Sequence, residues 1–417
     1  MTVELKALQQ QVKKLEKDLT QTGLADPKLK AEWQDARAAE RTASAFEAWL
    51  AERVTQVAVG WVLSTVFVRF CEDNGLIEYP FIAGPGERTA LARDLQQAFY
   101  ERHPERGDRD WLKASFDALS VSPVAKALFD EHNPMWSILP SPDQAKALLD
   151  FWRQTGEDGE LRYDLTDPEW DTRFLGDLYQ DLSESARKTY ALLQTPEFVE
   201  EFILNYTLDP AIEEFGLEPE PPYGHAELPH RLRVIDPACG SGHFLLGAFR
   251  RLLTAWQTQS PTTDNWVLIA NTLSSVHGVD KNPFAATIAR FRLMLAAMRA
   301  GNVTRLSANV NFPINVAVGD SLLHGKGAPG IQGEFDFDGS EKHVHTYRTE
   351  DVDDYIKSVH ILEVGTYHVV VANPPYLGSR KMDACLTAFA RAQYPMGRQD
   401  LYSCFVQRAI ELVDPRG

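Results

Sequence analysis

The residues Asn373-Pro374-Pro375-Tyr376 carry the strongest chemical signal in the chain, and they directly follow the apolar run Val369–Val371. Such a run is typical of a buried strand. Two prolines fix φ and remove two N–H donors, so the turn presents acceptors, namely the Asn373 side-chain oxygen and the Pro374 carbonyl. Together they can accept both protons of a planar –NH2 group while the Tyr376 ring stacks on its plane. The turn therefore predicts a site for a planar, amino-bearing substrate.

A second cluster, Asp236-Pro-Ala-Cys-Gly-Ser-Gly242, joins an apolar run to a predicted helix that begins near His243. Gly240 and Gly242 permit positive φ and close approach of a ligand to the backbone. The helix N-terminus offers N–H groups to a carboxylate, and Asp236 suits an amino group. An amino-acid-like ligand would satisfy both, although a Gly-Ser-Gly turn also occurs as a purely structural feature.

Two further predicted strands end in an aspartate. Val276–Asp280 is followed by Pro283, which begins a helix, and Asn315–Asp320 is followed by Ser321. A carboxylate at the first position can hold two ribose hydroxyls, and one at the second can accept from an exocyclic amine. Taken singly, each aspartate is equally consistent with a helix cap or a turn.

The elements that position these clusters alternate between strand and helix from about residue 186. Apolar β-branched runs cover 232–236, 275–280, 315–320 and 368–372, and helical patterns cover 243–256, 264–273 and 283–300. This alternation predicts an α/β fold with a parallel sheet covered on both faces. Ligands bind at the carboxyl ends of such strands, where the polar clusters lie.

The N-terminal part has a different pattern, with helical periodicity over 1–20 and from 28 to 148 and with breaks at Pro- and Gly-rich turns. It predicts an all-helical domain over 1–185, followed by the α/β domain over 186–417. The apolar run 54–70 contains Gln56 and Arg69 and is shorter than the ~20 apolar residues that a membrane span requires. We expect a buried core helix there and no membrane association.

The chain has 417 residues and a net charge of −17, which argues against a general DNA-coating role but permits a local basic groove. Its four cysteines are widely spaced, without a C-x-x-C pair, which predicts neither a disulfide framework nor a zinc knuckle. The N-terminus lacks the features of a signal peptide. These features indicate a cytoplasmic protein.

The pair of motifs from Asp236 to Gly242 and from Asn373 to Tyr376 resembles the signature of S-adenosylmethionine-dependent amino-methyltransferases, especially the DNA adenine-N6 group. Thr195-Pro-Glu-Phe198 resembles the family's N-terminal cofactor motif. The stretches Phe67–Gly75 and Phe174–Leu182 narrow the resemblance to the large adenine methyltransferases of BREX phage-defence systems. The resemblance implies a Rossmann-like methyltransferase domain preceded by the helical domain.

The resemblance also implies roles for individual residues. Thr195, Asp236, Ala238, Gly240 and Gly242 would line the methionine part of S-adenosylmethionine, Asp280 would hold its ribose, and Asp320 with Ser321 would hold its adenine. Asn373, Pro374, Pro375 and Tyr376 would hold an adenine flipped out of double-stranded DNA. Catalysis would consist of orienting the N6 amine for direct transfer, with no covalent intermediate.

The sequence departs from the family pattern in two places. An insertion covers 324–366, and its histidines, His343, His345 and His360, are better explained as solvated loop residues than as metal ligands; no metal site is predicted. The family's remaining strands and target-recognition domain would follow Gly417. We therefore expect a C-terminally incomplete catalytic domain that binds the cofactor without necessarily methylating DNA alone.

Two alternatives remain open. The same turn serves N-methylation of a protein glutamine or of RNA, because each presents an sp² nitrogen. A non-catalytic, cofactor-binding scaffold in a defence complex is the third hypothesis, and other defence proteins are expected partners under both the first and third.

Overall fold

The structure is a computed structural model that describes residues 5–168, 170, 172, 174–176, 182, 195–307, 309–324, 347–378, 382 and 384–416. The chain divides into two compact units. The first comprises Met1–Leu29, Phe46–Arg187 and Met294–Asn311, and the second comprises Lys30–Ala45, Lys188–Leu293 and Phe312–Gly417. The predicted boundary at 185/186 lies outside the described residues and stays a prediction.

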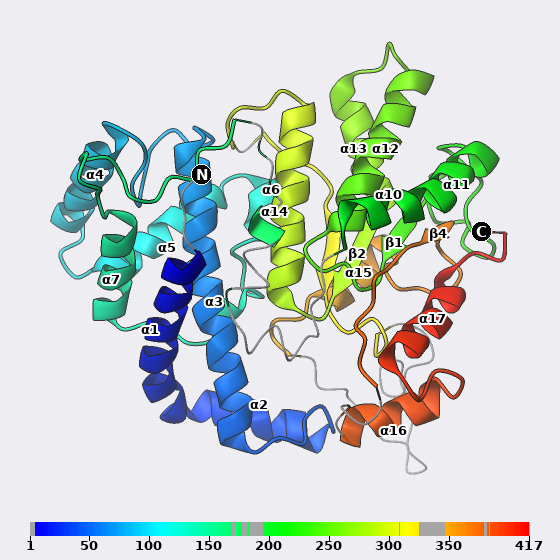
Figure 1. Ribbon diagram of the computed structural model, residues 1–417, viewed down its shortest axis with the longest axis horizontal. Helices are drawn as coiled ribbons and strands as arrows, with labels where there is room; N and C mark the ends of the chain where they lie inside the picture. The colour runs from blue at the N-terminus through cyan, green and yellow to red at the C-terminus, as the bar shows by residue number, and fades with distance from the viewer. Residues whose placement is uncertain are drawn as a thin grey trace. The chain divides into compact units, whose positions relative to one another are not determined.

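The described part of the first unit is built mainly from helices: α1 (Leu5–Leu24), α3 (Phe46–Asp73), α4 (Arg88–Arg102), α5 (Asp108–Leu119), α6 (Pro123–Lys126), the 3-10 helix η1 (Pro134–Trp136) and α7 (Pro142–Trp152). Helix α1 lies along α3 (Figure 1). It buries Leu8, Val12, Leu15 and Leu19, which share one helical face because they are three or four residues apart.

Helix α3 has the length and composition of a membrane span, with a mean hydropathy of 1.5 over its most apolar window. That window is 89% buried, however, which is the pattern of a core helix. The charged residues at the end of α3 are also paired inside the unit. Arg69 pairs with Glu72 at 3.1 Å and Asp73 at 2.9 Å, and Glu72 accepts three backbone N–H groups from residues 81–83. Burial of these charges is tolerated because each has a partner.

In its described residues, the second unit is organised around a parallel four-stranded sheet of order β3-β2-β1-β4. The strands are β1 (Val234–Asp236), β2 (Val276–Asp280), β3 (Asn315–Val318) and β4 (Val369–Val370). Val234 of β1 lies between Val276 of β2 and Val369 of β4. The predicted parallel α/β sheet is confirmed, although each strand is shorter than its apolar run.

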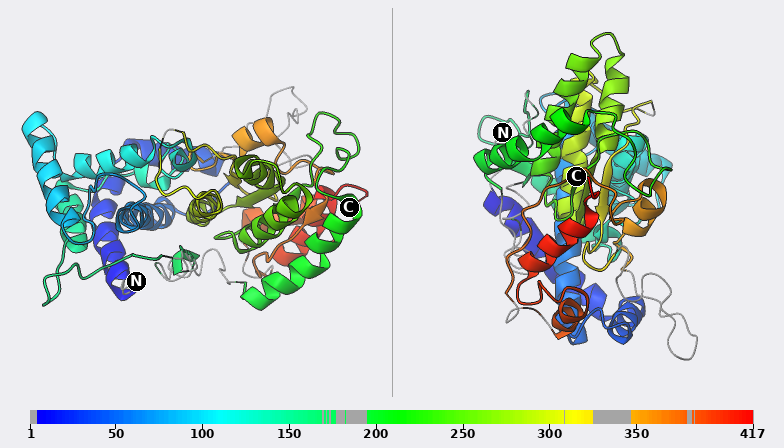
Figure 2. Two further views of the ribbon diagram at one scale, coloured as in Figure 1. Left: turned by 90° about the horizontal axis from the view of Figure 1, so that it is seen from above. Right: turned by 90° about the vertical axis from the view of Figure 1, so that its right-hand side faces the viewer.

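Helices pack against the sheet and against one another in this unit: α2 (Pro27–Ala38), α10 (Glu197–Tyr206), α11 (Leu208–Phe215), α12 (His243–Gln259), α13 (Asn265–Ser275), α14 (Pro283–Ala300), α15 (Val352–Val359), α16 (Ala384–Gln393) and α17 (Leu401–Leu412). The first residues of α2 and the last of α14 are counted with the first unit. Helices α12 and α13 form a projecting hairpin (Figures 1 and 2), which confirms the helix expected at 264–273.

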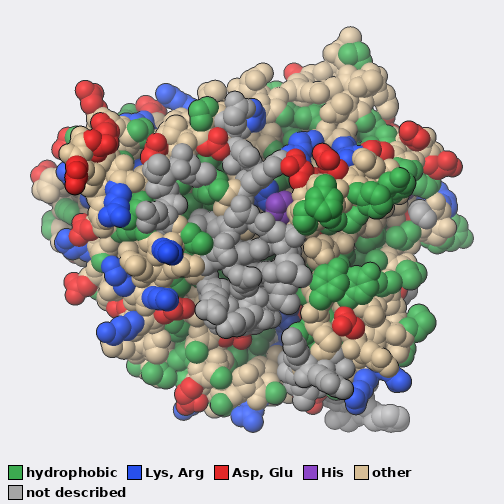
Figure 3. All heavy atoms as spheres, viewed as in Figure 1, with side chains coloured by type: hydrophobic (Ala, Val, Ile, Leu, Met, Phe, Trp, Pro, Cys, Tyr) green, Lys and Arg blue, Asp and Glu red, His purple; other side chains and the backbone are tan. Residues whose placement is uncertain are grey.

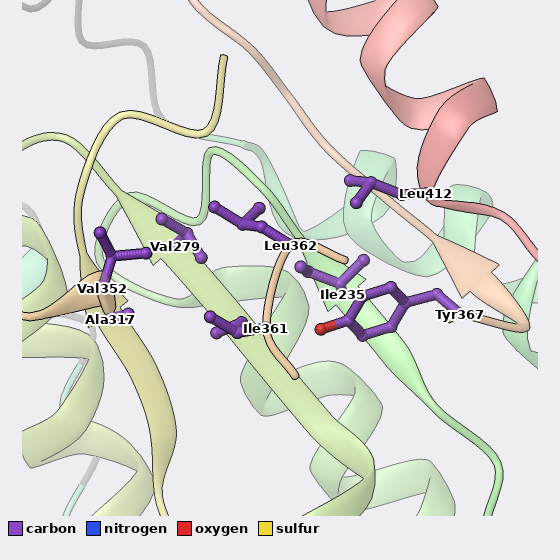
Figure 4. Packing of buried hydrophobic residues seen from close by; sticks show 8 residues of the cluster. All are labelled: Ile235, Val279, Ala317, Val352, Ile361, Leu362, Tyr367 and Leu412. Carbon is purple, nitrogen blue, oxygen red and sulfur yellow. The ribbon is translucent and has the colours of Figure 1, made fainter. Parts of the chain in front are cut away.

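The core of the sheet lies between its strands and the later part of the chain. Figure 4 shows Ile235, Val279 and Ala317 from three neighbouring strands, together with Val352, Ile361, Leu362, Tyr367 and Leu412. All eight are fully buried. The opposite face receives α12, since a side chain at Gly278 would lie 2.6 Å from Leu245 Cδ1. Both faces of the sheet are therefore covered, so a ligand can reach the sheet only at the ends of its strands.

Candidate active site

The turn after β1 is held by hydrogen bonds between its own backbone and the neighbouring strand. Cys239 N donates to the Val279 carbonyl at 3.0 Å, and Gly240 N donates to Asp280 Oδ2 at 2.8 Å. Gly240 has φ +54°, and a Cβ built there would meet no atom within 4 Å. The backbone at Gly240 therefore borders open space of the kind that a ligand can enter.

Gly242 is required for a different reason. It precedes α12 in a left-handed conformation with φ +86°, and a Cβ there would approach Ala289 of α14 to 3.0 Å. Its neighbour Ser241 is held through its carbonyl, which accepts from Arg292 at 2.8 Å. The glycine thus permits the sharp entry into α12, and Arg292 fixes the loop.

Asp236 ends β1, Asp280 ends β2 and Asp320 lies two residues after β3, so all three lie at one edge of the sheet. Asp236 pairs in register with Gly278, and Asp280 pairs with Val318, two residues before Asp320. Because the strands are parallel and adjacent, their carboxyl ends share that edge. The sheet therefore brings together the three carboxylates predicted to bind the cofactor.

Each of these carboxylates has a distinct set of partners. Asp236 Oδ1 accepts from Ala238 N at 3.0 Å, and Asp280 accepts from Gly240 N and Asn282 N, each at 2.8 Å. Asp320 Oδ1 accepts from Leu322 N at 3.1 Å. Its Oδ2 lies 3.1 Å from Lys281 Nζ.

Burial and neighbouring charge make the three carboxyl groups differ in acidity. Burial raises the pKa of Asp236 to about 8, a shift opposed by the Ala238 N–H and reinforced by Asp280. Burial likewise raises the pKa of Asp280 to about 6. Burial acts in the same direction on Asp320, but Lys281, Arg41 and the Leu322 N–H together outweigh it and leave the pKa of Asp320 lowered. The surroundings therefore favour the ionised form of Asp320 and the protonated forms of Asp236 and Asp280.

Ser321 lies at the same edge and closes the turn after β1. Its hydroxyl donates to the Pro237 carbonyl at 2.6 Å, and its own carbonyl accepts from Arg408 at 3.0 Å. Ser321 is buried, so its described contacts hold two loops together rather than exposing a free hydroxyl. Its predicted role beside the cofactor adenine stays a prediction.

The proline-containing turn follows β4, which is the direct neighbour of β1. Val371 N donates to the Ile235 carbonyl at 3.0 Å, so the backbone pairing continues to the start of the turn. Pro374 is buried, Asn373 and Pro375 are half-buried, and Tyr376 is 56% exposed. The sheet order therefore places this turn beside the turn that contains Asp236.

Thr195 is hydrogen-bonded to Asn373 of the proline-containing turn. The Asn373 amide donates from Nδ2 to Thr195 Oγ1 at 3.2 Å, just before α10. That hydrogen bond orients the amide with its Nδ2 toward the threonine, so Oδ1 is the atom left to accept from a substrate. Thr195 is therefore brought to the predicted substrate turn, whereas the sequence motif suggested a place near the cofactor.

Several residues of the site were not predicted from the sequence. Lys281 follows β2 and neutralises Asp320, and Tyr402 of α17 stacks on Tyr376. Arg41 pairs with Glu350 at 2.8 Å, and its charge also contributes to lowering the pKa of Asp320. A lysine next to a strand-end aspartate is a usable sequence signal, but Arg41 lies 309 residues from Glu350, and no local pattern links them.

A metal site finds no support in the described residues, where no group of three or more His, Cys, Asp or Glu side chains is arranged to hold an ion. His343 and His345 lie outside the described residues. His360 contacts Glu363 at 3.0 Å.

The donor set fits S-adenosylmethionine in chemical terms. Asp236 and Asp280 offer oxygen acceptors for an ammonium group and for hydroxyl groups, and the backbone at Gly240 borders open space. The N-terminus of α12 adds N–H groups that favour a carboxylate. Both ends of an amino acid moiety would thus find complementary charge.

Comparison with known proteins agrees with this chemistry. Residues 274–417 match the Eco57I restriction-modification methylase family. The chain is 47% identical to the adenine-specific methyltransferase PglX of Streptomyces coelicolor over 98% of its length. The chain resembles PglX. This confirms the resemblance inferred from the motifs.

The PglX similarity covers 34% of that relative, so the chain spans about a third of its length. The adenine-specific methyltransferase BrxX of Escherichia coli is 25% identical over 45% of the chain and 21% of BrxX. Among solved structures, the Type IIL restriction-modification enzyme MmeI in complex with DNA has a TM-score of 0.49 at 15% identity, covering 98% of this chain and 48% of MmeI.

Proposed function

We propose that the chain contains the catalytic machinery of a site-specific, adenine-specific DNA methyltransferase that uses S-adenosylmethionine to methylate adenine N6. The observation that supports this most directly is the position of the Asn373 turn, at the end of the strand next to β1 and its Asp236 loop. The 47% identity to PglX along the chain supports the same activity. A BREX-type anti-phage defence system is the proposed setting, with a cytoplasmic location and no membrane partner.

The proposal extends to the fold and to its division. We assign a helical N-terminal domain to 1–185 and a Rossmann-like, S-adenosylmethionine-dependent catalytic domain to 186–417. Double-stranded DNA with one flipped adenine is the proposed substrate, and other defence proteins are the proposed partners.

In this proposal the residues of the site bind, orient and exclude water. S-adenosylmethionine, when bound, supplies an electrophilic methyl group. Asp236 pairs with an ammonium group, Asp280 accepts from hydroxyls, and Asp320 accepts from an exocyclic amine. Ala238, Gly240 and Gly242 leave room along the backbone, while Ser321 keeps the neighbouring loops closed.

The substrate turn would act on the amine directly. Asn373 Oδ1 and the Pro374 carbonyl accept hydrogen bonds from the two N6–H groups and draw the nitrogen lone pair out of conjugation with the ring. Pro375 stiffens the turn, and Tyr376 stacks on the base. Because orientation supplies the catalysis, no side chain needs to form a covalent bond with the substrate.

Methylation-sensitive long-read sequencing of host DNA tests the proposal. Cells that carry the complete gene and its neighbouring defence genes are compared with cells that carry Asn373→Ala. We expect N6-methyladenine at one short motif in the first strain and its loss in the second. Retained cofactor binding by the purified variant would show that the fold survives. An unmarked genome in both strains would refute the proposal and direct attention to protein, RNA or scaffold functions.

A further inference from the structure

Tyr376 does not stand alone at the substrate turn. Its ring is stacked on the ring of Tyr402, with centroids 5.4 Å apart and planes 10° from parallel. Both rings remain partly accessible, at 56% for Tyr376 and 41% for Tyr402. Figure 3 shows hydrophobic side chains gathered on the surface over α10 and α17. The pair is thus an open aromatic platform rather than part of the core.

The backbone keeps these two rings in register. Leu401 N donates to the Leu377 carbonyl at 2.9 Å, and Gly378 and Asp400 form an isolated antiparallel bridge. The Asp400 side chain caps α17 by accepting from Tyr402 N at 2.8 Å. The segment that leaves the substrate turn is therefore tied to the start of α17 just after Tyr376 and just before Tyr402.

The start of α17 is itself anchored. Leu401, Cys404 and Phe405 are buried in a cluster with Leu322, Met382, Ala390 and Tyr394. Leu322 directly follows the loop that contains Asp320 and Ser321, and its carbonyl accepts from the Tyr394 hydroxyl at 3.0 Å. Tyr402 thus belongs to a helix whose first turn packs beside the predicted cofactor loop.

We propose that Tyr402 is a positioning residue for Tyr376: it supports one face of the Tyr376 ring and leaves the other face for the target base. This inference rests on the proposed function. The alternative is that the Tyr402 ring occupies the place of the target base and must move aside to admit it. The backbone contacts next to the stack favour support, because moving the start of α17 would break the Leu377–Leu401 bond and the Gly378–Asp400 bridge.

Two variants separate the ring of Tyr402 from its size and its hydroxyl. The described residues give that hydroxyl no hydrogen-bond partner, so Tyr402→Phe keeps the stack. Tyr402→Leu keeps apolar bulk but removes the ring. Tyr402 is also partly exposed at the start of a capped helix, so neither variant is expected to disturb folding.

The first measurement reports the stack without any substrate. A single 3-fluorotyrosine at position 376 gives one ¹⁹F resonance, whose shift contains the ring current of residue 402. We expect the same shift in wild type and Tyr402→Phe and a displaced, narrower line in Tyr402→Leu. An unchanged resonance in Tyr402→Leu would overturn the stack itself.

The second measurement tests whether the stack of Tyr402 on Tyr376 contributes to methylation. Single-turnover methylation is followed on a duplex that carries the motif found in the host genome, with the protein expressed from its complete gene. Because an aromatic pair contributes modestly, we expect the Tyr402→Leu rate to fall roughly 2- to 10-fold with cofactor affinity unchanged, and Tyr402→Phe to match wild type.

The outcomes distinguish the inference from the function on which it rests. A displaced resonance with an unchanged or faster rate in Tyr402→Leu would overturn the positioning role while leaving the methyltransferase proposal intact. A wild-type protein that marks no DNA would instead refute the proposed function, and the positioning role with it, whatever the resonance shows.

Discussion

The three aspartates that end neighbouring strands differ in charge at neutral pH because their surroundings differ. Asp320 has Lys281 beside it, whereas Asp236 and Asp280 lie in buried positions where only backbone N–H groups offset the loss of water. Burial accordingly raises the pKa of Asp236 to about 8 and that of Asp280 to about 6. A cationic ligand favours the ionised form of each, so ligand binding and proton release are coupled.

Cofactor affinity is therefore expected to rise with pH. Between pH 6 and pH 8, ionisation of Asp236 should strengthen binding of S-adenosylhomocysteine by roughly 10-fold, with a smaller contribution from Asp280. Isothermal titration calorimetry in buffers of different ionisation enthalpy measures both the affinity and the protons released. In Asp236→Asn the affinity should be lower and the steep part of the profile should disappear. An equally steep profile in the variant would assign the titration to another group.

The same shift predicts how pH acts on the free fold. The pKa of Asp236 lies above its ordinary value of 3.8, so its contribution to stability is complete below pH 4 and is lost as pH rises through about 8. The free energy of unfolding of the wild type should thus fall relative to Asp236→Asn over that range, as measured by urea denaturation. Parallel profiles for the two proteins would contradict a raised pKa at this position.

The contact between Thr195 and Asn373 predicts a positioning effect on catalysis. Thr195→Val keeps the side-chain shape but removes the oxygen that accepts from Asn373 Nδ2, so the amide is free to rotate. We expect kcat to fall by about 10-fold, the effect of one lost hydrogen bond, and Thr195→Ser to restore most of it. A loss confined to the KM for S-adenosylmethionine would instead support the cofactor role inferred from the sequence motif.

At the scale of elements, glycines at two strand ends serve different purposes. Gly240 borders open space after β1, whereas a Cβ on Gly319, after β3, would lie 2.5 Å from Val352 Cγ1 of the α15 segment. Gly319→Ala should therefore lower the free energy of unfolding by about 1–3 kcal/mol, the usual cost of overpacking. Chemical denaturation measures it.

Gly240→Ala is the matched variant. Its left-handed backbone costs about 1–2 kcal/mol, but its principal effect should be on cofactor affinity, because the added methyl enters the space beside the loop. Calorimetry with S-adenosylhomocysteine should show a larger loss for Gly240→Ala than for Gly319→Ala. The reverse order would mean that the open space beside Gly240 is not used by the cofactor.

The sequence was most informative where local pattern determines structure. Asn315 begins β3, Pro283 begins α14 and Asp280 ends β2, as the apolar runs and the helix-start signal predicted. The strand ends were less well predicted. The apolar runs begin at residue 232 and end at residue 372, whereas β1 begins at Val234 and β4 ends at Val370. Backbone hydrogen bonds still reach Arg233 and Val371, so the apolar run follows the paired region although the regular strand is shorter.

The contacts of the site were less predictable than its motifs. Thr195 and Asn373 are far apart in sequence, and the hydrogen bond between them arises only because α10 and β4 meet in the folded unit. Arg41 precedes the whole sheet and still influences Asp320. No spacing rule predicts such pairs, because they depend on tertiary packing rather than on the period of a helix or strand.

At the scale of the whole molecule, the two units are expected to respond differently to the cofactor. All predicted cofactor residues belong to the second unit, whereas α3 and its buried Arg69 group belong to the first. Hydrogen exchange with and without S-adenosylhomocysteine should show protection at 236–242, 280–282 and 318–322 and little change over 46–73. Equal protection of α3 would show that the ligand stabilises both units together.

The sheet order has a consequence for synthesis on the ribosome. β1 is synthesised first, and β2 and then β3 add to one side of it. β4 is synthesised last and pairs with the other side of β1. Val369, which pairs with Val234, is synthesised about 135 residues after it, or roughly 7–27 seconds later. During that interval the nascent sheet exposes a central strand as a bare edge, which can pair with another chain. The strand that carries the proposed substrate turn is thus also the strand whose pairing with β1 ends this exposure.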